Sequence, residues 1–198
     1  MQPSIEKKFR PDRTVDKWLA QYRNGSTRPA DRYYSLLLRG ESCTGKTAYG
    51  LSLFGWHSTL VVNCQGCSPD LPSIEAFDNQ VHSAILWDEI DEQQVLNNKM
   101  VFQAPAEPVT LGQSKWNQFG DVKLLHGVAM ILCSNTFDYP RGDSTCSKLN
   151  AMDRNWITSN IYEVRLGEGE VWWEETTEER AERLSKRPCR VVDEPKAP

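Results

Sequence analysis

The chain has 198 residues, of which 39% are hydrophobic and 25% are charged, and its formal net charge is −4. This length suits one domain of ordinary size, and this composition can bury a core while leaving polar tails. The negative net charge argues against a protein that coats duplex DNA over its whole surface, although a few lysines in a narrow channel are compatible with it.

Residues 1–30 are expected to form a polar tail followed by a short helix that Thr14 can cap. The apolar residues on one face of this helix are Val15, Trp18, Leu19 and Tyr22. The first residues lack the apolar segment of a secretory signal, and no stretch of the chain is long and apolar enough to cross a bilayer. We therefore expect an intracellular protein that has no membrane partner.

Residues 40–47 match the pattern G-x-x-x-x-G-K-[ST]. The apolar run 33–38 before them predicts a strand, and residues 46–54 after them can form a helix, which is the order that a phosphate-binding loop requires. The glycines let backbone N–H groups surround the phosphates, and the helix N-terminus adds its positive end. Lys46 would reach the β- and γ-phosphates, and the Thr47 hydroxyl would bind Mg²⁺.

The loop therefore predicts that the chain binds a nucleoside triphosphate. The expected nucleotide-binding residues are Gly40, Glu41, Ser42, Cys43, Thr44, Gly45, Lys46 and Thr47.

Further apolar runs occur at 59–63, 83–87 and 128–133, with a weaker one at 161–165. Continuous apolar runs are typical of parallel strands that are covered on both faces. Helical connections between such strands predict an α/β sandwich around a parallel sheet. Ligands of such sheets bind beyond the carboxyl ends of the strands.

Polar residues follow two of these runs. Asp88 and Glu89 come directly after the run 83–87, and Asn135 comes after the run 128–133. We expect Asp88 to hold Mg²⁺ and Glu89 to activate the water that attacks the γ-phosphate. Asn135 would hold this water or sense the γ-phosphate.

The six cysteines are expected to be reduced in an intracellular protein. Cys64 and Cys67 form one CxxC pair without a second pair, and His57 and His82 lie at no standard zinc spacing. We therefore expect neither structural zinc nor disulfides.

Residues 167–198 form a charged C-terminal extension. Residues 168–173 could add a small strand, 176–186 favour a helix, and the proline-containing end 187–198 has the composition of a disordered tail.

The ordered set of 40–47, 85–89 and 131–135 resembles the superfamily 3 helicases. It is most similar to the helicase domain of the replication-initiator (Rep) proteins of circular single-stranded DNA viruses and related plasmids. Segments 112–117 and 122–127 resemble that family's extra motif between the acidic pair and the Asn. Residues 153–160 resemble its downstream arginine segment. The resemblance covers about residues 30–166, so we expect one helicase and ATPase domain at 31–166.

The resemblance implies a P-loop NTPase with an AAA+-like three-layer sandwich and a central parallel sheet of strand order 5-1-4-3-2. Such domains assemble into rings, usually hexamers, that hydrolyse ATP with Mg²⁺ and translocate on single-stranded DNA. They unwind duplex DNA during replication of a small circular genome. If the protein is viral, the resemblance also implies that it works in the host nucleus.

The resemblance also implies two groups of basic residues. The extra motif forms a hairpin that lines the channel of the ring, and its candidates for gripping the phosphate backbone are Lys115, Lys123 and His126. Arg154 would act as an arginine finger in the site of the neighbouring subunit, with Arg141 and Arg165 as alternatives.

Complete viral initiators also carry a nicking domain with a paired-histidine motif and a tyrosine nucleophile. The chain has no His-x-His, and the region before the loop is too short for that domain, so we expect no nicking activity. Two alternatives to a helicase remain. One is an NTP-binding switch or assembly factor that does not translocate. The other is a kinase whose lid would use the late arginines Arg180, Arg183, Arg187 and Arg190.

Overall fold

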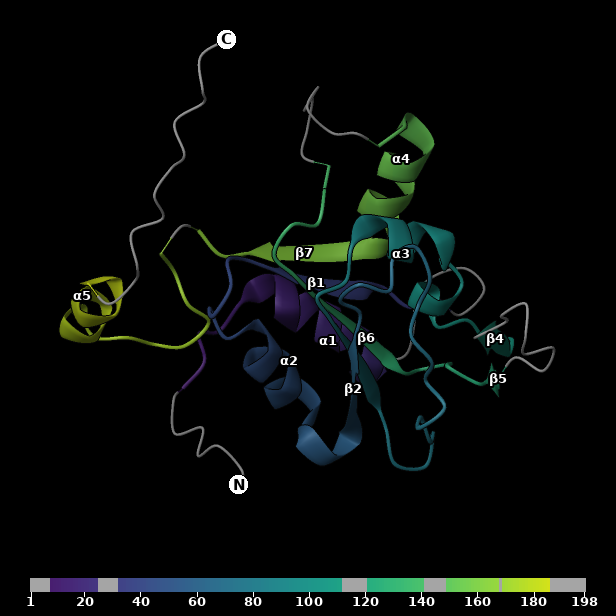
Figure 1. Ribbon diagram of the computed structural model, residues 1–198. Coiled ribbons are helices and arrows are strands. Elements are labelled where there is room, and N and C mark those ends of the chain that lie inside the picture. Colours follow the sequence, from purple (N-terminus) through teal and green to yellow (C-terminus); the bar gives the residue numbers. More distant parts are fainter. Residues whose placement is uncertain (1–7, 25–31, 112–120, 141–148, 168, 186–198) are drawn as a thin grey trace, which may run out of the picture.

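The computed structural model describes residues 8–24, 32–111, 121–140, 149–167 and 169–185. Its centre is a parallel sheet of five strands with helices packed around it (Figure 1). The strands are β1 (Ser35–Arg39), β2 (Thr59–Asn63), β3 (Ala84–Asp88), β6 (Ala129–Ser134) and β7 (Ile161–Arg165). The mixed α/β fold with a parallel sheet that the apolar runs predict is confirmed.

Neighbouring strands of the sheet follow the order β2-β3-β6-β1-β7, and every neighbouring pair is parallel. When these five strands are numbered only among themselves, the order from the β7 edge is 5-1-4-3-2. The strand β1 thus lies between β6 and β7, and β6 lies between β1 and β3. The carboxyl ends of β1, β6 and β3 consequently lie side by side at one edge of the sheet.

The sheet separates two hydrophobic clusters. On one face, Leu37, Ile85 and Leu132 pack with residues of α3 (Glu92–Asn97), the 3₁₀ helix η3 (Val101–Gln103) and α4 (Ala151–Asn160). On the other face, Leu36, Leu86 and Ile131 pack with residues of α1 (Arg13–Asn24) and α2 (Lys46–Phe54). Helices on both faces produce three layers, and they explain why β6 is buried along its whole length.

The helix α1 is an integral part of this core. Val15 and Trp18 are buried, and the Trp18 indole N–H donates to the Tyr34 carbonyl at 2.7 Å. The expected cap is wrong, because Asp12 and not Thr14 caps the helix. The Asp12 carboxylate accepts from the backbone N–H groups of Thr14 and Val15, so Thr14 already lies inside the first turn.

Two further parts lie outside the central sheet. The strands β4 (Val109–Leu111) and β5 (Asp121–Lys123) pair as an antiparallel two-stranded ribbon. The helix α5 (Thr177–Ser185) projects away from the sheet and has no buried residue (Figure 1). Within the described part of 168–173, the only strand-like pairing is a single antiparallel bridge between Phe9 and Trp173. None of the helices within the described ranges is long and apolar enough to span a membrane.

Trp87, directly before the acidic pair, belongs to the first cluster. Its side chain is buried, and its ring packs against Phe102 with 5.5 Å between the ring centroids. The large residue at the end of β3 therefore fills the space between the sheet and η3.

Gly50 lies where α2 packs closely against the sheet. A Cβ atom at this position would lie 2.7 Å from Leu86 Cδ1 and 3.1 Å from Ile131 Cγ2. Although alanine favours helices, we expect Gly50→Ala to lower the free energy of unfolding by about 1–3 kcal/mol because it overpacks this contact. Chemical denaturation measures the change.

Ser52→Ala on the exposed side of the same helix is the matched control, and we expect it to change stability by less than about 0.5 kcal/mol. A stabilising effect of Gly50→Ala would contradict the close contact between α2 and the sheet.

Candidate phosphate-binding and catalytic site

The loop 40–45 joins β1 to α2, as its sequence pattern predicts. Two of its residues adopt the left-handed backbone conformation, Cys43 with φ of 61° and Gly45 with φ of 89°. Gly45 is the N-cap residue of α2, and no side chain caps the helix there. The first N–H groups of α2 are therefore free of a side-chain cap, as a phosphate ligand at a helix N-terminus requires.

Lys46 is buried, and three oxygen atoms accept hydrogen bonds from its ammonium group. They are the carbonyls of Gly40 at 3.1 Å and Glu41 at 2.8 Å, and Asn135 Oδ1 at 2.6 Å. Burial lowers the pKa of Lys46, and the negative charges of Glu89 and Asp88 oppose this shift. The ammonium is thus held beside the loop as a poorly hydrated charge, which strengthens its attraction to a phosphate oxygen.

Thr47 and Asp88 meet at the neighbouring position. The Thr47 hydroxyl lies 3.1 Å from both carboxylate oxygens of Asp88 and donates to them. Hydroxyl and carboxylate oxygens are the ligands that Mg²⁺ prefers, together with water and phosphate oxygens. These two side chains therefore fit the expected magnesium site.

Glu89 is exposed, and its carboxylate accepts hydrogen bonds from Asn135 Nδ2 at 3.1 and 2.9 Å. Its backbone is left-handed, with φ of 56°, which is uncommon for a residue other than glycine. The next residue anchors this turn, because the Ile90 N–H donates to the Cys133 carbonyl at 3.2 Å. A strained backbone conformation that persists at the end of a strand is typical of functional sites.

Asn135 connects these groups. Its amide oxygen accepts from Lys46, and its amide nitrogen donates to Glu89 and, at 3.2 Å, to Ser42 Oγ of the loop. The five residues Lys46, Thr47, Asp88, Glu89 and Asn135 thus come together in space, as the sequence pattern leads us to expect. They come from β1–α2, β3 and β6, whose carboxyl ends are adjacent.

The two described candidates for DNA binding, Lys123 and His126, lie outside this network. Lys115 falls in residues 112–120, outside the described residues. The Lys123 ammonium donates to the carbonyls of Glu75 and Phe77, and it lines a hollow of about 560 Å³ on the ribbon side of the molecule. The exposed His126 ring packs edge-on against Tyr33.

The two described arginine candidates, Arg154 and Arg165, are also outside this network. Arg154 is partly exposed on α4, and Arg165 is exposed at the end of β7. Arg141 lies outside the described residues. Within the described part of the chain, no hydrogen bond or ion pair joins Arg154 or Arg165 to Lys46, Asp88, Glu89 or Asn135.

The sequence reasoning missed a second set of residues at the loop. The backbone N–H of Trp172 donates to the Thr44 carbonyl at 3.1 Å, and the Trp173 ring lies against Gly45. The only sequence signal was a pair of large aromatic residues inside a charged extension. Nothing in the spacing indicated that they would return to the loop.

No family model and no curated protein matches the chain. Among solved structures, the chain is similar to the S. cerevisiae Hsp104–ADP complex with a TM-score of 0.48 and 16% sequence identity. The alignment covers 88% of this chain and 36% of that chain, so this chain spans much less than the length of that protein. The fold and the loop between β1 and α2 fit a P-loop NTPase-like fold on their own geometry.

The cysteines of the described ranges differ sharply in their surroundings. Cys43 of the loop is exposed, whereas Cys64 and Cys133 are buried. Burial raises the pKa of the Cys64 thiol to about 12, and it raises the pKa of Cys133 well above its ordinary value. Within the described residues, no group of three or more His, Cys, Asp or Glu side chains could hold a metal ion.

These differences make Cys43 a probe of the loop. Cys43 is exposed, whereas Cys64 and Cys133 are buried thiols with raised pKa values, so we expect iodoacetamide to alkylate Cys43 at least about ten-fold faster than the other two. ATP with Mg²⁺ should slow the reaction of Cys43, because the phosphates would cover the loop. Peptide mass spectrometry measures each rate.

Cys67 is the internal control, since it is partly exposed and lies outside the loop. Its rate should not respond to ATP. Unchanged alkylation of Cys43 at saturating ATP would contradict phosphate binding at residues 40–47.

Proposed function

We propose that the chain is an ATP hydrolase that binds ATP with Mg²⁺ at residues 40–47. The observation that carries this proposal is the convergence of Lys46, Thr47, Asp88, Glu89 and Asn135 from three separate segments. Each has the chemistry that its position requires. Lys46 supplies a cation, and Thr47 and Asp88 supply oxygen ligands for a metal. Glu89 supplies a base and Asn135 a polar amide, and all five lie at the N-terminus of α2.

Lys46 would move little when a nucleotide binds. Its ammonium now donates to two loop carbonyls and to Asn135, and a γ-phosphate oxygen would replace at least one of these acceptors. Thr47 and Asp88 would hold Mg²⁺, which neutralises charge between the β- and γ-phosphates. The two side chains are already in contact, so they need no large rearrangement.

Glu89 would accept a proton from the attacking water. Its exposed carboxylate is within hydrogen-bond distance of Asn135, and the Asn135 amide could orient both the carboxylate and the water. A phosphate oxygen that replaces Asn135 Oδ1 as an acceptor for Lys46 would free this amide oxygen for the water. Asn135 would thus link the occupancy of the loop to the position of the base.

Two substitutions separate binding from hydrolysis. Lys46→Ala should abolish ATP binding, because it removes the cation at the loop. Glu89→Gln should keep binding but reduce hydrolysis by about 10²–10⁴-fold, because an amide cannot accept the proton. Calorimetry measures binding, and phosphate release measures hydrolysis.

Glu107→Gln is the matched control, since Glu107 is exposed and lies outside the network of the site. It should leave both quantities unchanged. Hydrolysis at the wild-type rate in Glu89→Gln would show that another group acts as the base.

We further propose that this ATPase is a ring-forming, hexameric helicase that translocates on single-stranded DNA. The ordered motifs support this proposal, as does the antiparallel ribbon β4–β5, which flanks residues 112–120. Lys115 would contact the DNA backbone from this segment. Lys123 and His126 are weaker candidates, because in the structure they contact backbone carbonyls and Tyr33. Arg154 on α4 would reach the site of a neighbouring subunit.

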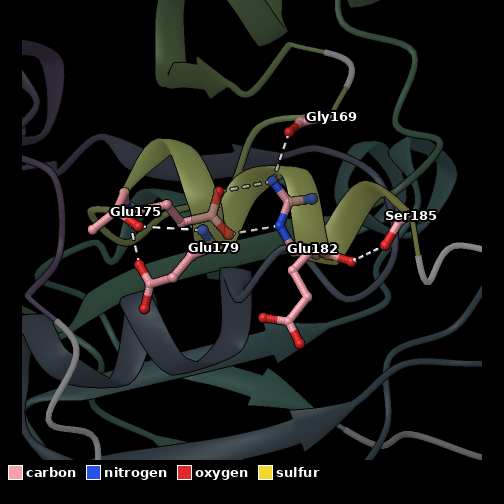
Figure 2. A network of polar contacts seen from close by, with 7 residues as sticks. Gly169, Glu175, Glu179, Glu182 and Ser185 are labelled. Atoms are coloured by element: carbon pink, nitrogen blue, oxygen red, sulfur yellow. Dashed lines mark hydrogen bonds and ion pairs between the residues drawn. The ribbon is translucent and has the colours of Figure 1, made fainter.

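The kinase alternative is less well supported. A kinase lid would need arginines that are free to close over the phosphates. Arg183 instead donates to both carboxylate oxygens of Glu175 and to the Gly169 carbonyl, at 2.6 to 2.8 Å (Figure 2). The side chain of Glu175 in this ion pair is only 3% exposed, so opening the pair would leave a charge poorly hydrated.

The ATPase rate at increasing protein concentration, with and without single-stranded DNA, tests the helicase proposal against a switch. We expect the specific rate to rise with concentration, because a neighbour completes each site, and to rise further with DNA. Arg154→Ala should remove the dependence on concentration. Lys115→Ala should remove the stimulation by DNA and keep the basal rate within about two-fold, since a phosphate contact supplies DNA affinity only.

Lys17→Ala, on the exposed side of α1, is the matched control for the loss of one lysine. A rate that rises with concentration and ignores DNA would favour the switch. A specific ATPase rate that responds neither to protein concentration nor to single-stranded DNA would contradict a ring helicase.

A further inference from the structure

The chain that follows β7 returns to the phosphate loop. The Leu166 N–H donates to the Arg39 carbonyl at 2.9 Å, directly before the loop begins. Further on, the Trp172 N–H donates to the Thr44 carbonyl at 3.1 Å. We call residues 169–174 the C-terminal strap. It holds the end of the loop through its backbone.

Trp173 of this strap touches the loop with its ring. A Cβ atom built on Gly45 would lie 2.5 Å from Trp173 Cζ3 and 2.9 Å from Cε3, so the ring lies directly against the Gly45 backbone. Gly45 is also the N-cap of α2, where no side chain caps the first helical N–H groups. The indole therefore lies beside the phosphate site and remains partly exposed.

The backbone of Trp173 pairs with the N-terminal segment. Phe9 and Trp173 form an antiparallel bridge, with hydrogen bonds from Arg10 N–H to the Trp172 carbonyl and from Glu174 N–H to the Lys8 carbonyl. The neighbouring Trp172 ring stacks on Tyr49 of α2, with centroids 4.5 Å apart. Trp173 is thus a large aromatic ring on a well-supported backbone.

The sheet order decides which end of a nucleotide would meet this ring. Asp88, Glu89 and Asn135 come from β3 and β6, which lie on one side of β1. The γ-phosphate must face these residues. The strand β7 lies on the other side of β1, and the strap follows β7. A triphosphate that runs along the loop would therefore bring its nucleoside end toward Trp173.

We propose that Trp173 forms one wall of a nucleobase-binding subsite and stacks on the base of the bound nucleotide. The inference rests on the proposed nucleotide binding at residues 40–47 and adds the group that binds the base. An indole suits this role because a flat aromatic face attracts any base. A base held at Trp173 would also fix the phosphates in line with Lys46 and Glu89.

The test compares two ligands that differ in the base. ATP and inorganic tripolyphosphate, each with Mg²⁺, are titrated into the wild type and into Trp173→Leu and Trp173→Phe by calorimetry. Leucine keeps an apolar side chain against Gly45 but has no aromatic face. We expect Trp173→Leu to bind ATP about ten-fold more weakly and to bind tripolyphosphate as the wild type does. Trp173→Phe should stay within about three-fold of the wild type for both.

Trp56→Leu is the matched control, because Trp56 is 49% exposed on η2 (Trp56–Ser58), outside the strap. It should change neither affinity. Equal weakening of ATP and tripolyphosphate by Trp173→Leu would show that Trp173 only supports the loop and would overturn the proposal. Unchanged ATP binding in Trp173→Leu would overturn it too. Failure of the wild type to bind either ligand would instead contradict the proposed function.

Discussion

The buried ammonium of Lys46 is the group around which the rest of the site is arranged. A charge removed from water is costly unless hydrogen bonds and opposite charges compensate it. Here the Gly40 and Glu41 carbonyls turn toward it, and Asn135 closes the third contact at 2.6 Å. The loop must therefore wrap around the side chain, and β6 must lie next to β1 so that Asn135 can reach it.

The order of the strands then places the remaining groups. With β6 beside β1, the next strand β3 brings Asp88 to Thr47 and Glu89 to Asn135. A parallel sheet gathers the carboxyl ends of its strands at one edge, so residues distant in sequence become neighbours there. A change of strand order would leave the same residues unconnected. The strand order of the sheet therefore determines which side chains meet the loop.

Much of this could be predicted from the sequence, and the reason is physical. Strands that are buried on both faces are apolar throughout, so continuous apolar runs locate them well. The runs that begin at 83 and 128 predict the first residues of β3 and β6 to within one residue. The loop pattern is dictated by close contact with phosphate. The Asp12 cap of α1 was missed, because Thr14 two positions later has similar chemistry. The contact of Trp173 with Gly45 could not be predicted, because the sequence pattern of a charged extension does not show which part of the domain it packs against.

The loop is consequently held from two sides by different parts of the chain. Lys46 and Asn135 fix it on the side of β6, where hydrolysis would occur. The C-terminal strap fixes it on the side of β7, and this strap is itself paired with residues 8–10. The loop, Trp173 and the N-terminal segment are thus joined by consecutive contacts. Thr44 makes its contact through its carbonyl, and Gly45 makes its contact because it has no side chain, so this side of the loop depends on the backbone of Thr44 and on a glycine at 45.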